Sequence, residues 1–134
     1  MLGLFGPLNR RRAERDANAA AQLYELRERA RSSGRGAYVV HVLSVYQQAH
    51  RGTKAFVKND ATGAVRDAWF WWSRIKPGEI LLVEASSGWG PHSGRTDVLY
   101  VGGEHRGRGI SQGLPSGTAK RARRHEARAR AGRA

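Results

Sequence analysis

Residues 36–60, GAYVVHVLSVYQQAHRGTKAFVKND, mark the point at which the chain changes from a helical to a β-strand pattern. After Gly36, β-branched and aromatic residues dominate, and turn-forming residues recur every several positions, which is typical of an all-β region. We therefore expect a strand over residues 38–47 and a second over 53–58, joined by a turn at residues 50–52.

Three more strands continue this pattern. We expect them over residues 64–72, 79–85 and 96–101. Between two of them, Pro77-Gly78 suits a type II turn. Five short antiparallel strands predict a small closed barrel, and both SH3-like and OB-like barrels have five strands. Residues 73–78 are too few for the helix that an OB-fold usually carries between its third and fourth strands, which favours an SH3-like or a trimmed OB-like barrel.

A helix is expected before the barrel. Residues 9–31 are strong helix formers, and Ser32-Ser33-Gly34 is a stop signal. The apolar residues of this segment fall at helical spacing on one stripe, Ala19, Leu23, Leu26 and Ala30. Because the stripe is small, the helix needs a partner surface.

The carboxyl-terminal segment has a different composition. After Val101 only Ile110 and Leu114 are large and apolar, so we expect residues 103–134 to form a disordered basic tail. The alanine-rich part, residues 119–131, would become helical once phosphates neutralise its arginines. The expected organisation is a basic helical arm (1–36), a mainly β domain with a five-stranded antiparallel barrel (37–102), and the tail (103–134).

The charge is strongly positive and uneven. The formal net charge is +13 and the pI about 11.4, with arginine far outnumbering lysine. The net charge is +4 in residues 1–36, +2 in 37–102 and +7 in 103–134. A GC-rich coding sequence also produces arginine, but it would raise the number of acidic residues too, and there are only 11. This excess indicates a polyanionic partner, and nucleic acid is the leading expectation.

Several classes of function find no support. The chain has no cysteine, and its five histidines lack the paired spacing of a zinc site, so neither a metal nor another cofactor is expected. No convergent acid, base and nucleophile suggests an enzyme, and no catalytic residue is assigned. The apolar opening, residues 1–8, is too short to span a membrane and lacks the basic leader and the cleavage site of a signal peptide, so we expect a cytoplasmic protein.

The run Trp69-Phe70-Trp71-Trp72 is the most unusual feature of the sequence. Alternation along a strand sends Trp69 and Trp71 to one face and the other two rings to the opposite face. We expect one pair in the core and one pair exposed as a stacking platform or an interface, unless the helix covers it. Val65 shares the parity of Trp69 and Trp71 and favours that pair as the core, whereas Asp67 shares it too and argues against the assignment. The sequence leaves open which pair is buried, and we take Phe70 and Trp72 as the binding candidates.

The second strand suggests a similar surface. Ala55 and Val57 should face inward, so Lys54, Phe56 and Lys58 share the outer face, where cations flank an aromatic ring. Such a pattern suits single-stranded nucleic acid, although a solvated barrel face would look the same. The remaining binding candidates come from the loops and the tail: Trp89, Arg95, Arg106, Arg108, Lys120, Arg121, Arg123 and Arg124.

These residues predict a nucleic-acid-binding protein of low sequence specificity, in which the arms neutralise phosphates and the barrel aromatics stack bases. The sequence leaves open DNA or RNA, and single or double strands. The alternative is a structural protein of a ribonucleoprotein or virus-like particle, a homo-oligomer or larger assembly in which the aromatic face is a subunit interface.

Overall fold

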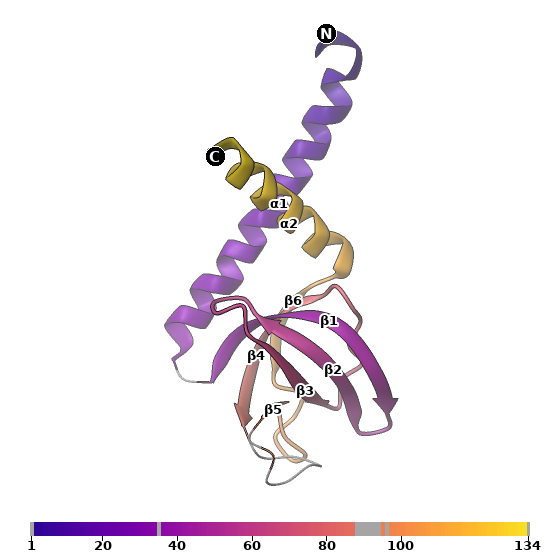
Figure 1. Cartoon of the computed structure of the whole chain (residues 1–134), viewed down its shortest axis with the longest axis vertical. Helices are drawn as coiled ribbons and strands as arrows, with labels where there is room; N and C mark the ends of the chain where they lie inside the picture. Colours follow the sequence, from indigo (N-terminus) through magenta and orange to yellow (C-terminus); the bar gives the residue numbers. More distant parts are fainter. Residues whose placement is uncertain (1, 35, 88–94, 96, 134) are drawn as a thin grey trace.

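A computed structural model shows a barrel flanked by two helices (Figure 1). It describes residues 2–34, 36–87, 95 and 97–133, with the side chains of residues 2–6 left out. The helices are α1 (Leu2–Ser33) and α2 (Ser116–Arg133). The strands are β1 (Ala37–Ala49), β2 (Gly52–Asn59), β3 (Val65–Trp71), β4 (Ile80–Ser87), β5 (Val98–Val101) and β6 (Ile110–Leu114).

Five of the strands close into a barrel, as the sequence predicted. The order is β1-β2-β3-β5-β4, and β4 pairs back onto β1. The pairings around the barrel are antiparallel except that of β3 with β5, which is parallel and corrects the expectation of a fully antiparallel barrel. The sixth strand, β6, pairs with β4 outside this circuit.

Inward-facing side chains from all five strands fill the barrel. The buried cluster consists of Val40, Val42, Ala55, Val57, Ala68, Phe70, Ile75, Leu81, Val83, Leu99 and Val101. The type II turn expected after β3 is present, because Gly78 has a φ of 90° and the Glu79 amide donates to the Lys76 carbonyl. This turn joins β3 to β4 without an intervening helix.

Both helices pack on the outside of the barrel. The predicted stripe of α1 is buried: Leu23 and Leu26 contact the outer side chains of β1, β4 and β6 together with α2. Residues 80–83 of β4 are all apolar because both faces of this strand are covered. Leu81 and Val83 point into the barrel, whereas Ile80 and Leu82 lie under the helices.

The expected disordered tail is instead ordered. Residues 110–114 form β6, and residues 116–133 form α2, which packs against α1 (Figure 1). The prediction failed because Ala119 and Ala122, although small, are completely buried in this contact. Small side chains let helices approach closely, so composition alone underestimated the surface that this segment buries.

Ion pairs between distant segments also hold α2. The completely buried carboxylate of Asp16 accepts two hydrogen bonds from Arg124, at 2.9 and 2.8 Å, and one from Arg128, at 2.6 Å. The hydrogen bond from Arg124 is the main reason that the pKa of Asp16 lies far below its usual value, against the opposing effect of burial. Both arginines lie far from Asp16 in the sequence, 108 and 112 residues later.

A second polar network joins both helices to the barrel. Arg27 of α1 donates to Asp60 in the turn after β2, at 2.7 Å, and to Glu126 of α2, at 2.5 Å. Asp60 also contacts Nε2 of the buried His41, whose Nδ1 accepts from Arg123. Burial opposes ionisation of Asp60, but the hydrogen bonds from His41 and Arg27 outweigh it and lower its pKa well below the usual value.

Candidate nucleic-acid interface

Strand β2 presents a basic and aromatic outer face. Ala55 and Val57 point into the barrel and are buried, whereas Lys54, Phe56 and Lys58 point outward, as alternation predicted. Phe56 is 42% exposed, Lys58 is exposed and Lys54 is half-buried. Lys54 and Lys58 therefore flank an accessible ring.

Tyr46 of β1 completes this surface, and the sequence analysis missed it. Its ring lies 5.2 Å from that of Phe56, and the side chain is 49% exposed. The Tyr46 hydroxyl donates to Asp67 of β3 at 2.6 Å, and burial together with this bond raises the pKa of Tyr46 to about 12. Simple alternation from Val40 and Val42 would turn Tyr46 inward, but a bulge between Val42 and Ser44 shifts the register with β2, so that Ser44 pairs with Phe56 and Tyr46 lies on the outer face.

The aromatic run does not divide into one core pair and one exposed pair. Phe70 fills the barrel interior and is completely buried, so its assignment to a binding surface was wrong. Trp69 and Trp71 point to the opposite face and are also buried, in a separate cluster with the side chains of β5. Residues 68–71 of β3 are therefore buried on both faces of the strand, and the α1 stripe lies elsewhere, over β1, β4 and β6.

The packing of Trp69 depends on a glycine across the sheet. A Cβ at Gly52 would overlap both the Phe70 carbonyl and the Trp69 ring, so only glycine leaves room here. Within the described part of the chain, the Trp69 indole nitrogen is buried without a hydrogen-bond partner. This buried cluster borders the exposed outer face at Lys54, which pairs with Trp69 in the register of β2 and β3.

Trp72 leaves the strand and is exposed. Its φ is 57°, in the left-handed region that non-glycine residues rarely adopt, and the side chain is 41% exposed. The ring is held in place: its Nε1 donates to the Glu104 carbonyl at 3.0 Å, and the Arg51 guanidinium lies 5.9 Å from the ring centroid. Arg51 also pairs with the Glu104 carboxylate. Non-glycine residues in the left-handed region cluster at functional sites.

The binding residues predicted in the loops do not come together in one site. Arg95 pairs with Asp97 at 2.8 Å, and Arg106 is exposed. Arg108 is exposed and donates from Nε to the Ser73 hydroxyl at 3.0 Å, beside Trp72 in the sequence. The predicted Trp89 lies outside the described residues.

The four candidates in α2 divide into two kinds. Lys120 is exposed and Arg121 half-buried. Arg123 donates to His41 and to the Gly78 carbonyl, and burial lowers its pKa, while Arg124 is bound to Asp16. Arg123 and Arg124 therefore hold the fold together in this structure, which sequence reasoning had not distinguished from exposed cations.

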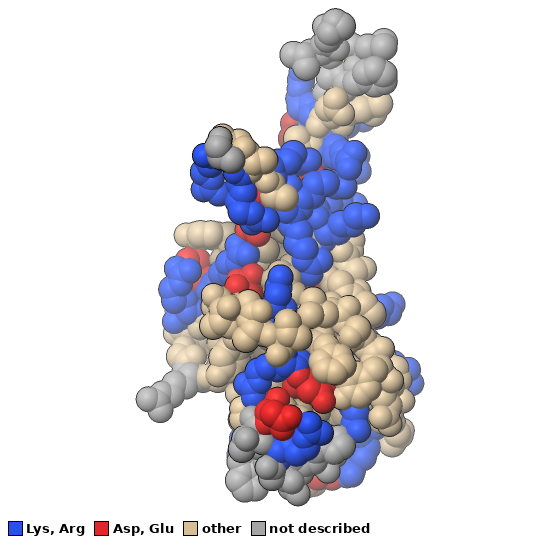
Figure 2. Space-filling model, viewed as in Figure 1, with Lys and Arg blue, Asp and Glu red and all other residues tan. Residues whose placement is uncertain are grey.

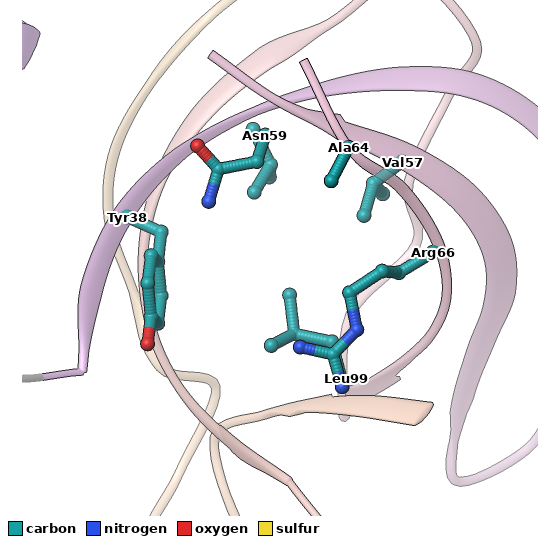
Figure 3. A pocket seen from close by; sticks show the side chains of 7 residues that line it. Tyr38, Val57, Asn59, Ala64, Arg66 and Leu99 are labelled. Atoms are coloured by element: carbon teal, nitrogen blue, oxygen red, sulfur yellow. The ribbon is translucent and has the colours of Figure 1, made fainter. Parts of the chain in front are cut away.

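One end of the barrel has a small hollow. Figure 3 shows the side chains of Tyr38, Asn59 and Arg66 around it, with the apolar Val57 and Leu99 beside them. Its space of about 30 Å³ corresponds to roughly one water molecule, which is too little for a nucleobase.

Among the described residues, no cluster of histidine and carboxylate side chains could hold a metal ion, and no helix is long and apolar enough to cross a membrane.

Comparison with known proteins identifies no relative of this chain. The chain matches no family model, no curated protein and no solved structure.

Proposed function

We propose that this protein binds single-stranded nucleic acid with low sequence specificity, across the outer face of β1, β2 and β3. The observation that carries the proposal is the exposed ring pair of Tyr46 and Phe56, flanked by Lys54 and Lys58. Rings of this kind stack on bases of any sequence, while adjacent cations contact the phosphates.

The barrel topology supports this choice of face. A strand order of β1-β2-β3-β5-β4 closing on β1, with β3 and β5 parallel, is that of an OB-like barrel, which we prefer to the SH3-like alternative. OB-like barrels bind oligonucleotides through the face of strands 2 and 3 and the adjoining loops. The helices pack over β1, β4 and β6, so the face carrying Phe56 is free of them.

The spacing of the side chains also fits a strand of nucleotides. Lys54 and Lys58 are four residues apart, which corresponds to roughly 13 Å along a strand, and Phe56 lies midway between them. Beyond Lys54, the β1–β2 turn and the end of β3 contribute Arg51 and Trp72. A single strand running along β2 would meet a cation, two neighbouring rings, a cation, and then the second aromatic site.

Fluorescence anisotropy with a labelled single-stranded oligonucleotide tests the proposal. Phe56→Ala should weaken binding by about 1–3 kcal/mol with little change in melting temperature. Tyr24→Ala is the matched control, because Tyr24 is 62% exposed but lies on α1, away from this face. An equal effect of the two variants on affinity, or no effect of either, would remove the β2 face from the binding site.

The alternative is an assembly protein, and one observation favours it. Leu43 of β1 and Val65 of β3 are 46% and 57% exposed and lie on the two strands that flank β2, which makes part of this face apolar. Such a face can be a subunit interface. Size-exclusion chromatography without nucleic acid separates the two, since the assembly function predicts an oligomer that Phe56→Glu dissociates, and our proposal predicts an elution volume unchanged by that variant.

A further inference from the structure

The helices carry a second charged surface that the barrel face does not explain. Figure 2 shows Lys and Arg side chains gathered where α1 and α2 lie, while much of the barrel below is free of them. Two groups of exposed cations contribute, Arg10, Arg11, Arg12 and Arg15 on α1 and Arg128, Arg130 and Arg133 on α2. This surface is distinct from the β2 face in both its position and its chemistry.

A groove between the two helices lies within this surface. Alanines of both helices line it, together with Arg10 and Glu14 of α1 and His125 and Arg128 of α2. Because alanine is small, the groove is open to a bulky ligand, and its polar groups can reach that ligand.

Internal ion pairs prepare the groove for an anion. The buried carboxylate of Asp16 holds Arg128, whose side chain remains 50% exposed, so the remaining N–H groups of that guanidinium are presented in a fixed orientation. Glu126, the acidic residue of α2, is already bound to Arg27. Asp16 and Glu126 are thus engaged inside the molecule, which leaves Glu14 as the acidic residue of the groove lining, outnumbered by the outer arginines that remain for a polyanion.

The side chains of this surface are suited to contact phosphates and not bases. Residues 7–17 and α2 contain no Phe, Trp or Tyr, the large rings that form stacking platforms for unpaired bases, and His125 is the one imidazole in these two segments. Arginine and lysine contacts to phosphates give affinity without sequence information. Duplexes present the highest density of phosphates, one charge per roughly 1.7 Å of helix axis.

We infer that the ligand is a nucleic acid containing both a duplex and a single strand. The α1–α2 groove binds the phosphates of the duplex, and the β2 face binds the adjoining unpaired strand. This inference rests on the proposed function, because it adds a second surface to the single-strand site. The two surfaces belong to one rigidly packed molecule, so a junction that reaches both gains from a high effective concentration.

Anisotropy with three labelled ligands tests the inference: a single strand, a blunt duplex, and the same duplex with that strand as an overhang. The junction should bind at least about tenfold more tightly than either part. A variant with Arg10, Arg11 and Arg12 all changed to Gln should lose most of this gain and keep its affinity for the single strand. The control changes Arg31, Arg74 and Lys76 to Gln, which removes the same charge from exposed positions outside both surfaces and should keep the gain.

The outcomes separate the two proposals. If the single strand binds but the duplex adds nothing, the junction inference is overturned and the proposed function stands. Equal losses in the two triple variants would also overturn it, because they would show a general effect of charge. If the single strand does not bind at all, the proposed function fails, and this inference fails with it.

Discussion

The carboxylate of Asp16 is completely buried and accepts two hydrogen bonds from Arg124, a residue 108 positions later in the chain. Arg128 binds the same carboxylate from the next turn of α2. One acidic residue of α1 therefore fixes two arginines of an otherwise strongly basic helix. This contact explains how a segment with few large apolar residues is ordered against the remainder of the fold.

Replacing this carboxylate should loosen α2. In Asp16→Asn two guanidinium groups lose their charged acceptor, and we expect the melting temperature to fall by at least roughly 5 °C. Glu14→Gln is the control, because Glu14 lies two residues away and is exposed. Circular dichroism measures both variants. Equal melting temperatures for Asp16→Asn and the unaltered protein would mean that the ion pairs contribute nothing to stability.

Stability should fall as the solution is acidified. The pKa values of Asp16 and Asp60 are lowered in the folded state, so both groups stabilise the fold above their ordinary pKa. This contribution is lost as the pH falls from about 5 towards the folded-state values. Melting temperatures at a series of pH values should decline below about pH 5, and less steeply in Asp16→Asn. Parallel curves for the two proteins would contradict this assignment.

Removing α2 should damage the fold as well as binding. A chain that ends at residue 115 loses the buried Ala119 and Ala122. The side chains of Leu23 and Leu26 on α1, which pack against them, become exposed to water. We expect a lower melting temperature and increased binding of a hydrophobic dye. An unchanged unfolding transition would show instead that α2 is an independent arm.

The limits of sequence reasoning are clearest in the four consecutive aromatics. Alternation correctly separated Phe70 from Trp69 and Trp71, but it could not show that β5 contributes a second cluster around the two tryptophans. Periodicity reports which residues share a face and not what covers that face. By contrast, the five barrel strands and the α1 stripe were predictable, because each depends on the local pattern of apolar residues.

The candidate site was predictable to a similar degree. Phe56 and its two lysines follow from strict alternation in β2, whereas Tyr46 depends on a bulge in β1 that no local signal marks. Arg123 and Arg124 look like exposed cations in the sequence because their partners, His41 and Asp16, lie far away along the chain. Charge composition indicates how many cations there are and not which of them the fold itself engages.

The conformation of Trp72 makes a further prediction. A non-glycine residue in the left-handed region costs about 1–2 kcal/mol, which glycine does not incur. Trp72→Gly should therefore be more stable than Trp72→Ala by about 1 kcal/mol, although both lose the same ring contacts with Arg51. Urea denaturation compares them. If the alanine variant is the more stable of the two, the backbone of residue 72 is not strained. In either case, both variants should weaken oligonucleotide binding to the same extent, because both lack the indole ring.

An NMR titration of the ¹⁵N-labelled protein with a short single-stranded oligonucleotide tests the central claim most directly. The proposed function predicts that the amide signals of Tyr46, Lys54, Phe56 and Lys58 shift first and saturate together, while those of the opposite side, around Ile80 and Leu82 of β4, stay in place. Shifts confined to α1 and α2, or no shifts at all, would contradict binding of single strands on the barrel.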